Sequence, residues 1–292
     1  MGTFIAGSTM TSLFVLEDLM TASAEVLGKG TAGSTYKATL QSGYTDTVVK
    51  RLRTLDLPKE EFDLRVAMIG AIQNKHIAPL HWYYFSNDEK LLVYNFFPMG
   101  SVAHALHGNP VSSAAQLGWE QRAAIALAAA RGVAYIHSAG PSSCHGNIKS
   151  SNVMLTGTHD ACVSEHGLTA LGLFPGVSGY SAPEITDEKW VSQEADVYNF
   201  GVLLLELLTG KDPVKNTQLE DGVNLPQWVC SVAQHEWAAK VIDVQLVGQQ
   251  RKDGEEECMV RLLQLAIHCC SEDANSRPTM SDVVQQIEKM QA

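Results

Sequence analysis

The stretch AEVLGKGTAGSTYKATL, Ala24 to Leu40, decides the fold of the first third of the chain. Gly28, Gly30 and Gly33 separate two runs that suit β-strands. Glycine permits a tight turn and lets the backbone approach a phosphate closely, so this spacing is typical of a nucleotide loop between two strands. A single glycine loop is as often a simple turn. The stretch therefore predicts a β-hairpin and only a candidate phosphate site.

The residues around this hairpin predict a sheet with one helix. The β-branched run TVVKRL, 47–52, predicts a strand, and residues 80–96 predict two strands around an Asn-Asp turn. LEDLM, 16–20, predicts a short helical turn before the hairpin. Between the strands, residues 58–72 predict an amphipathic helix from apolar side chains at helical spacing: Phe62, Val66, Ile69 and Ile72.

The remaining two thirds of the chain predict helices. Apolar residues recur at helical spacing in 119–138 and 258–270, and 279–290 opens with a capping-box pattern. Residues 195–210 are apolar nearly all round and predict a buried helix that ends at Gly210. The prediction is an α+β, bilobal fold. Its parts are an N-terminal extension (1–20), a small β-rich lobe (21–94) and a hinge with a larger α-helical lobe (95–292).

Composition limits the partners. A net charge of −11, from 21 basic and 32 acidic residues, repels phosphate and predicts no binding to nucleic acid. No apolar run approaches the roughly 18 residues that span a bilayer. The six cysteines form no CxxC or Cys/His metal spacing, which indicates reduced thiols and no metal site. We expect the isolated domain to be a monomer.

A second stretch, SSCHGNIKSSNVML at 142–155, adds chemistry to this architecture. With its neighbours it resembles the protein-kinase signature set, in order and in context. The resemblance rests on the three glycines and on VVK ending at Lys50, HGNIKSSN, VSEHGL, Ala182-Pro183-Glu184, Asp196 and Gly201 in DVYNFG, and Arg277 in SRPTM.

Four further stretches of the sequence make the resemblance more specific. EDLMTASAEVLGKG, KLLVYNFFPMGS, FGVLLLELLTGKDP and LPQWVCSV resemble the cytoplasmic domain of plant leucine-rich-repeat receptor-like kinases, in a branch with many kinase-dead members. The resemblance implies a single-pass receptor with extracellular repeats and a membrane span outside this chain. It places the domain at the cytoplasmic face of the plasma membrane, with active protein kinases as partners in a receptor complex.

The resemblance also shows departures at the catalytic positions. Asn147 replaces the aspartate that accepts the substrate proton, and an amide accepts no proton near neutral pH. Gly146 replaces the arginine that anchors a phosphorylated activation segment. Glu165 replaces the metal-binding aspartate and is one methylene longer, which suits poorly the strict octahedral geometry of Mg²⁺. His166 replaces a phenylalanine that packs on His145; we expect two neutral, hydrogen-bonded imidazoles, with pH sensing as the alternative.

The phosphate-holding residues are partly kept. Lys50 could contact phosphates or simply pair with a nearby carboxylate. Arg65 stands where the helix glutamate should pair with Lys50, and two cations repel each other. Glu61, one turn earlier, is the alternative partner. Asn152 could hold a second Mg²⁺ or bond the loop backbone, and Lys149 also remains.

The adenine pocket departs as well. Thr35 replaces the roof valine and Val48 the strand alanine, while Tyr94 would guard the back of the pocket. Asn95 and Phe97 would offer hinge backbone groups. Val48 and Tyr94 together narrow the slot, so we expect weak or absent Mg-ATP binding, no functional metal site and no other cofactor.

The positions that resemble fold residues are intact: Glu184, Asp196, Trp228 and Arg277. The positions that stabilise the fold are therefore kept, whereas the positions that carry the chemistry are changed. The sequence therefore predicts a pseudokinase that acts as a binding and allosteric module for an active partner kinase. Two alternatives stay open: a weakly active atypical Ser/Thr kinase that uses Glu165 and Lys149, and a nucleotide-binding switch without phosphate transfer.

Overall fold

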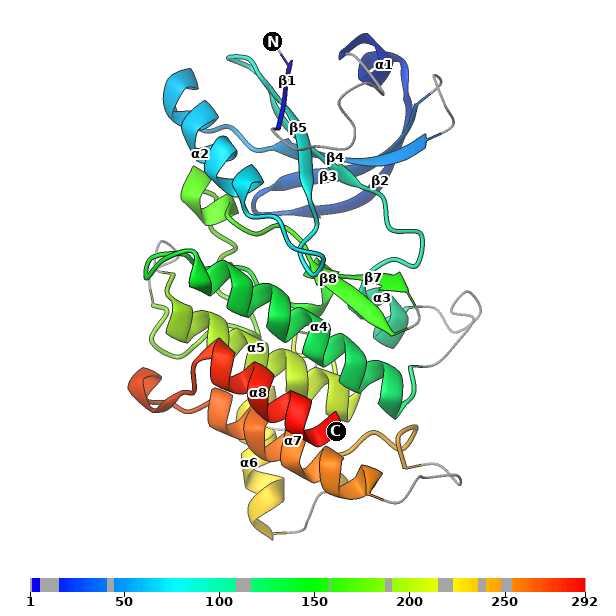
Figure 1. The fold of residues 1–292 in the computed structure, drawn as a ribbon, viewed down its shortest axis with the longest axis vertical. Coiled ribbons are helices and arrows are strands. Elements are labelled where there is room, and N and C mark those ends of the chain that lie inside the picture. The colour runs from blue at the N-terminus through cyan, green and yellow to red at the C-terminus, as the bar shows by residue number, and fades with distance from the viewer. Residues whose placement is uncertain are drawn as a thin grey trace.

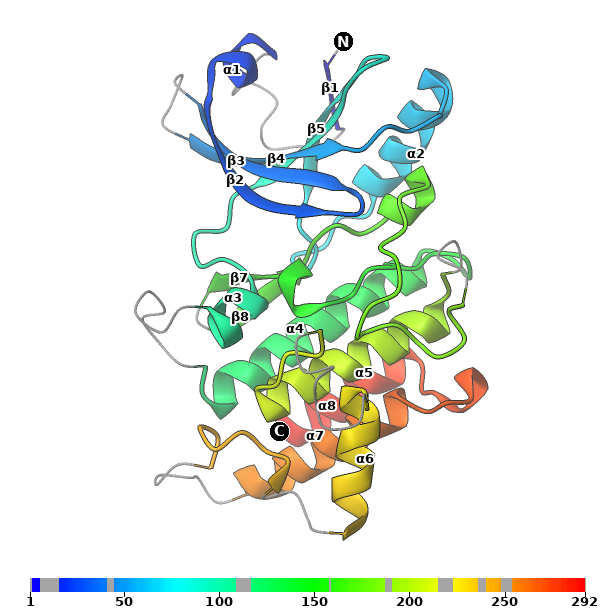
Figure 2. The ribbon, with the colours of Figure 1, turned by 180° about the vertical axis from the view of Figure 1, so that it is seen from behind.

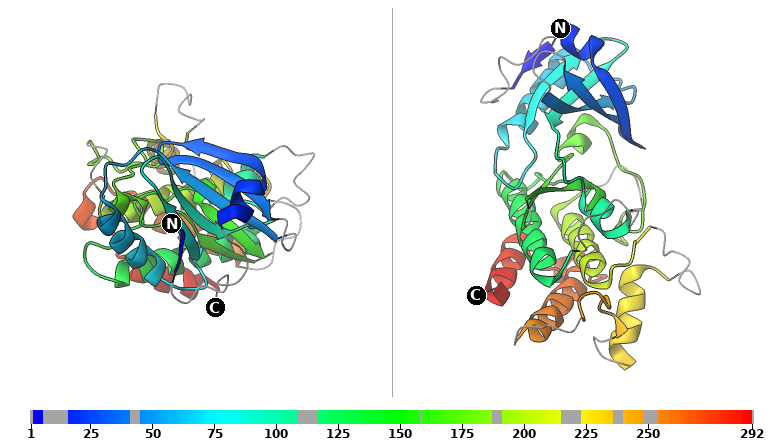
Figure 3. Two further views of the ribbon diagram at one scale, coloured as in Figure 1. Left: turned by 90° about the horizontal axis from the view of Figure 1, so that it is seen from above. Right: turned by 90° about the vertical axis from the view of Figure 1, so that its right-hand side faces the viewer.

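The computed structural model describes residues 2–5, 16–40, 45–108, 117–157, 159–186, 191–214, 223–235, 240–247 and 254–291. They form two lobes stacked along the long axis, a β-rich lobe above a helical one (Figures 1 and 3). The α+β bilobal architecture predicted from the sequence is confirmed. Among the described residues, no helix combines the length and the apolar character that a membrane span requires.

The small lobe is built on a six-stranded antiparallel sheet in the order β1-β5-β6-β4-β3-β2. Its glycine loop is the turn of the β2–β3 hairpin, in which Gly30 lies opposite Gly33. Gly33 has φ +139°, a conformation that favours glycine. The strands are β1 (Gly2–Phe4), β2 (Ser23–Gly30), β3 (Gly33–Leu40), β4 (Thr45–Leu52), β5 (Leu80–Phe85) and β6 (Lys90–Asn95).

Helix α2 (Lys59–Ala71) lies beside this sheet and buries one face against it (Figure 1). Phe62 and Val66 are fully buried, as their spacing predicts. The prediction was wrong at Ile72, which is extended and caps the helix instead of continuing it. The short helix α1 (Leu16–Thr21) precedes β2, as LEDLM indicates.

The sequence did not predict β1, which pairs with β5 from within the N-terminal extension. Ile5, just after β1, is 6% exposed and belongs to the core of the small lobe. Part of the extension is therefore integrated into the small lobe.

The large lobe is helical, with a two-stranded sheet of β7 (Val153–Gly157) and β8 (Asp160–Val163) facing the small lobe. Helix α5 is buried along nearly its whole length and ends at Gly210, whose φ of +67° forms the helix C-cap. The helices, visible from behind in Figure 2, are α3 (Val102–His107), α4 (Trp119–Ser138), α5 (Gln193–Thr209), α6 (Leu225–His235), α7 (Glu255–Cys269) and α8 (Met280–Gln291).

Asp196 ties the centre of the large lobe together. Its carboxylate accepts the backbone N–H groups of His145 (2.6 Å) and Gly146 (2.8 Å) and lies 3.0 Å from Nε2 of His137. The side chain is 1% exposed, so these donors replace the water it has lost. The buried acid predicted to cap the loop at 142–155 is confirmed.

Arg277 anchors the segment that ends at Glu184. Its guanidinium binds both carboxylate oxygens, at 2.6 and 2.7 Å, and also donates to the carbonyl groups of Ser271 and Glu194. The Arg277 side chain is completely buried, whereas that of Glu184 is 30% exposed. Partial burial acts to raise the pKa of Glu184, but the hydrogen bonds and charge of Arg277 outweigh it and lower the pKa.

We expect Glu184→Ala to lower the free energy of unfolding by about 3 kcal/mol, because it leaves the buried Arg277 charge without its counter-ion. This value is at the low end of the usual range, because Arg277 would keep its hydrogen bonds to the carbonyl oxygens of Ser271 and Glu194. The melting temperature should fall by roughly 6 °C or more. Arg131→Ala is the control: its pair with Glu288 is more than 40% exposed on both sides, and its loss should cost under about 1 kcal/mol. Equal melting temperatures for Glu184→Ala and the control would contradict this role.

Candidate nucleotide and catalytic site

The two charged groups most needed for phosphate chemistry are bound to each other. Lys50 on β4 donates to the carboxylate of Glu165. The side chains are 6% and 20% exposed, so water competes little for either charge. Of the two readings of Lys50, the structure shows the pairing with a nearby carboxylate. The ammonium group and the carboxylate therefore each already have a partner of opposite charge.

Arg65 does not approach Lys50. It pairs with Glu61 one turn earlier on α2, and its Nη1 donates to the carbonyl oxygen of Ala170 at 2.5 Å. The suggestion that Glu61 substitutes as the partner of Lys50 is therefore wrong. A neighbour four residues away on one helix captures Glu61 at little entropic cost.

Asn147 and Gly146 lie beside this pair. The Asn147 amide nitrogen is 3.4 Å from Glu165 Oε2, so the amide donates toward the carboxylate. Gly146 has φ +74°, and a Cβ there would lie 2.7 Å from the Thr169 methyl group. The positive φ at 146 thus favours glycine, and a side chain there would also have to displace Thr169.

Asn152 has a structural role. Its side-chain nitrogen donates to the Asn147 carbonyl oxygen at 2.9 Å, and its backbone carbonyl accepts from the Ser164 amide. Of the two roles considered, the structure shows the bond to the loop backbone. Lys149 lies near both Glu165 and Lys50. Burial lowers the pKa of Lys149, the charge of Glu165 raises it, and the charge of Lys50 lowers it further.

Glu165 also has an unusual backbone. Its φ of +64° makes it the one non-glycine residue with positive φ in the part of the chain that the structure describes. Such strain persists where surrounding contacts hold it, and it is concentrated at functional positions. The backbone at Glu165 is therefore held in a rare conformation while its carboxylate pairs with Lys50.

As placed here, the Glu165 carboxylate does not fit a Mg²⁺ ion. A magnesium ion needs oxygen ligands in near-ideal octahedral geometry. Both carboxylate oxygens of Glu165 have partners in Lys50 and Asn147, whereas Asn152 donates its amide nitrogen to the loop, a bond that does not involve its side-chain oxygen. Within the described ranges, no three His, Cys, Asp or Glu side chains gather as a potential metal site.

His145 and His166 are both almost completely buried. Burial lowers the pKa of both rings, and with the neighbouring His145 it takes the pKa of His166 to about 4, so both are neutral at physiological pH. His166 Nε2 lies 3.2 Å from the Ile69 carbonyl oxygen, and His145 Nδ1 accepts a hydrogen bond from the backbone N–H of Asn147. The other nitrogen of each ring has no partner in the described structure, so the predicted hydrogen bonding is only half realised.

The residues expected to narrow the adenine slot lie on facing strands. Val48 on β4 lies directly opposite Tyr94 on β6, and Thr35 on β3 lies opposite Lys50 on β4. Tyr94 is 6% exposed, and its hydroxyl has no hydrogen-bond partner in the described structure. Burial and the nearby Glu165 carboxylate raise the pKa of Tyr94. The Tyr94 hydroxyl therefore lies near the Lys50–Glu165 pair.

Part of the hinge hydrogen-bonding capacity is used internally. The Tyr94 carbonyl accepts from Thr47 Oγ1 at 2.8 Å, and the Phe97 carbonyl accepts the Gly100 amide. The Asn95 side chain lies 2.9 Å from His81 Nε2. Of the hinge backbone groups expected to meet adenine, the Phe97 carbonyl oxygen already serves the fold.

Sequence reasoning missed a second buried carboxylate, Glu206 on α5, which is 0% exposed. It accepts from Tyr180 and from Ser150 at 2.7 Å, and His107 lies 2.8 Å away. A lone glutamate within the apolar run GVLLLELLTG is the signal that could have revealed it, because a buried carboxylate needs partners. Tyr180 lies in the segment 165–184, and its hydroxyl is thereby enclosed.

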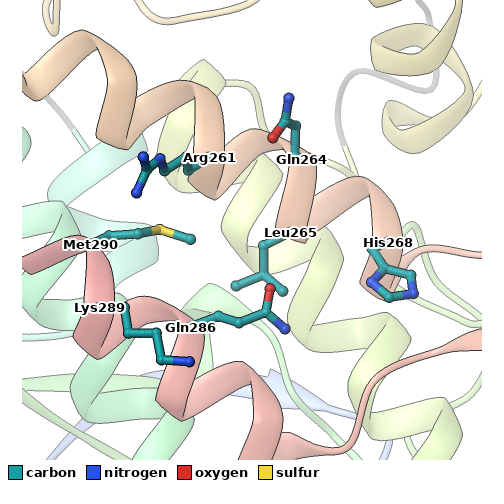
Figure 4. Close-up of a pocket in the computed structure, with 7 residues that line it drawn as sticks. All are labelled: Arg261, Gln264, Leu265, His268, Gln286, Lys289 and Met290. Carbon is teal, nitrogen blue, oxygen red and sulfur yellow. The ribbon is translucent and has the colours of Figure 1, made fainter.

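A separate hollow of about 330 Å³ lies between α7 and α8, far from this site (Figure 4). Arg261 on its rim already pairs with Glu257, and both side chains are more than half exposed. Solvated cations over an apolar floor are typical of the seam between two packed helices. The lining residues are Arg261, Gln264, Leu265, His268, Gln286, Lys289 and Met290.

The fold and the site together define a protein kinase architecture, and the comparisons agree. Residues 21–287 match the family described as protein tyrosine and serine/threonine kinase, so the chain belongs to this family.

Relatives of high similarity are plant receptor kinases. A probable inactive receptor kinase of Arabidopsis thaliana, At1g48480, is 49% identical over 96% of this chain. A probable leucine-rich repeat receptor-like protein kinase of the same plant, At1g68400, is 44% identical over 95%. The chain spans 43% and 42% of the length of these two relatives.

Two solved structures share the fold. The kinase domain of maize SIRK1 (sucrose-induced receptor kinase 1), bound to AMP-PNP, is 28% identical with a TM-score of 0.85, and the match covers both chains completely. The pseudokinase domain of BIR2, an immune regulator of the RLK/Pelle family, is 29% identical with a TM-score of 0.76. That match covers 98% of this chain and 85% of the other.

We expect Mg-ATP to leave the melting temperature unchanged within error. A ligand at 100 times its dissociation constant would add about 2.7 kcal/mol of stability, or roughly 5 °C or more for a domain of this size. Thermal unfolding with millimolar Mg-ATP and with Mg²⁺ alone measures the effect. A magnesium-dependent rise that disappears in Lys50→Ala would show that the site still binds nucleotide.

Proposed function

We propose that this chain is a catalytically inactive receptor-like pseudokinase domain. The observation that carries the proposal is the Lys50–Glu165 pair, which joins the phosphate-binding cation to the carboxylate at the metal position. Three further changes support it: Asn147 at the base position, Arg65 on α2 and Tyr94 in the adenine slot. The names of several relatives, given as probable inactive receptor kinases, point the same way.

The proposed activity is binding and allosteric control of an active protein kinase in a receptor complex. The large lobe supports this role because its structural contacts are complete: Asp196 holds the loop, and Arg277 holds the end of the segment. A stable fold without phosphate chemistry is suited to recognition. By analogy with its receptor-kinase relatives, the domain would work at the cytoplasmic face of the plasma membrane.

One alternative rests on specific observations. All three glycines, Lys50 and Asn152 remain, and the similar maize SIRK1 domain was solved with AMP-PNP. These features favour a nucleotide-binding switch without phosphate transfer over a weakly active kinase, because a switch needs neither a base nor a precisely placed metal.

We expect the purified domain to transfer no phosphate to itself or to a generic substrate above a no-enzyme control. Asn147→Asp alone should not restore transfer. It returns the base, but its carboxylate would face Glu165 while Lys50 stays engaged, and groups that act as a unit are not additive. Incorporation of labelled phosphate measures both variants.

The decisive control is Lys50→Ala. Phosphate incorporation by the unmodified domain that disappears in Lys50→Ala would refute the proposal. Turnover in Asn147→Asp alone would show that Glu165 and Arg65 are compatible with catalysis, and the weakly active kinase would then be the better description.

A further inference from the structure

Strand β1 holds the start of the N-terminal extension against the small lobe. It pairs with β5 at the edge of the sheet that lies next to α2 (Figures 1 and 3). The pairing continues past the strand, because the backbone N–H of Ile5 donates to the His81 carbonyl oxygen at 2.9 Å. Gly2 fits its position closely, since a Cβ there would overlap the Trp82 ring. Residues 2–5 therefore form a strap that is seated on β5.

The strap is connected to the first half of α2 through Tyr83. Successive residues of a strand point to opposite faces of a sheet, so Thr3 and Ile5 share one face of β1. Thr3 lies directly opposite Tyr83 on β5. Burial raises the pKa of Tyr83, and a hydrogen bond with the Thr3 side chain partly offsets that rise. The Tyr83 hydroxyl also donates to Asp63 Oδ1 on α2 at 2.9 Å, so it joins the strap to the helix.

Ile5 contacts the last turn of α2 directly. A Cβ at Gly70 would lie only 2.5 Å from Cγ2 of Ile5. Ile5 is 6% exposed and belongs to the same apolar cluster as three residues of α2: Phe62, Val66 and Ile69. Glycine is unfavourable within a helix relative to alanine. The glycine at position 70 is therefore explained by the space that the Ile5 side chain occupies.

The same turn of α2 contacts the candidate site. The Ile69 carbonyl oxygen lies 3.2 Å from Nε2 of His166. A Cβ at Gly167 would come within 2.6 Å of the Ile69 side chain, so the helix and this backbone are closely packed. His166 directly follows Glu165, whose φ is +64° and whose carboxylate pairs with Lys50. The last turn of α2 is therefore in contact with both the strap and the backbone that carries Glu165.

We propose that the strap sets the position of α2 relative to the Lys50–Glu165 pair, and that Ile5 is its positioning residue. Strand β1 has only three residues and lies at the edge of the sheet, so it opens at a lower cost than the central strands. An event on the N-terminal extension that lifts Ile5 from Gly70 would release the last turn of α2 and, with it, the backbone beside Glu165. This inference goes beyond the proposed function, because the strap positions α2 whether or not the domain transfers phosphate.

Hydrogen exchange of the intact domain tests this role. In Ile5→Ala we expect exchange in α2 and in residues 164–167 to rise at least about tenfold, because the last turn of the helix loses a buried side chain on which it packs. Ile5→Val removes a single methyl group and should give the same pattern with a smaller rise, about threefold. Ile287→Ala is the matched control, because it removes a buried isoleucine from α8 in the large lobe. It should leave exchange in both regions unchanged.

A double-mutant cycle tests the contact between Ile5 and Gly70. Gly70→Ala should lower the melting temperature of the unmodified domain, because the added methyl group overlaps Ile5. In the Ile5→Ala background the same change should raise the melting temperature by roughly 2 °C or more, because the space is free and alanine favours the helix. Equal shifts in the two backgrounds would overturn the proposal, since Ile5 would then not control the fit of α2.

A readout at Lys50 separates positioning from a loss of stability alone. The Lys50 side chain is paired and 6% exposed, so a short pulse of acetic anhydride should modify it slowly. The rate should rise at least about threefold in Ile5→Ala, the effect of weakening one hydrogen bond at His166, and stay unchanged in Ile287→Ala. Unchanged modification in Ile5→Ala would overturn the proposal even if α2 exchanged faster, and so would an equal rise in Ile287→Ala. Phosphate transfer by the unmodified domain would refute the proposed function, whereas the exchange and modification rates decide the role of the strap.

Discussion

The buried pair between Lys50 and Glu165 is the interaction on which the state of the site depends. In a kinase that transfers phosphate, the lysine serves phosphate oxygens and the acid serves Mg²⁺. Here each neutralises the other in a place that is four-fifths or more buried. A ligand would have to break this pair before it gained either contact, because buried charges lose much when their partner leaves. Because position 65 is an arginine and position 147 an asparagine, the site lacks a glutamate that could compete for Lys50. It also lacks an aspartate that could act as a base once Lys50 was released.

The two lobes differ in how their polar groups are used. In the large lobe, Asp196 and Arg277 have full sets of hydrogen bonds, so the loop at 142–155 and the end of the segment at Glu184 are held in place. In the small lobe, Lys50 pairs with Glu165, and Arg65 pairs with Glu61. This arrangement suits the recognition role proposed above. The similarity to both an AMP-PNP-bound kinase domain and a pseudokinase domain fits a fold that can host different functions.

Most of the fold could be predicted from local patterns, because helix periodicity, the hairpin glycines and the helix end at Gly210 depend on residues that are close together in the sequence. The structure places Glu165, which the motifs single out, against Lys50 and Asn147 beside Glu165. What the sequence could not supply was the choice among partners. Glu61 could pair with Lys50 or Arg65 by pattern alone, and only the packing decides. The contact of Ile5 with Gly70 and the three-residue strand β1 were missed because neither carries a local signal: each depends on residues far away in the chain.

The most direct test of the central claim is a double-mutant cycle on the free energy of unfolding with Lys50→Met, Glu165→Gln and both together. Each single variant leaves one buried charge without its partner, whereas the double variant leaves none. The account predicts that the double variant is more stable than the sum of the single effects allows, by about 1–3 kcal/mol. Additive effects within about 0.5 kcal/mol would contradict it. They would mean that Lys50 and Glu165 do not stabilise each other and that their pairing does not account for the state of the site.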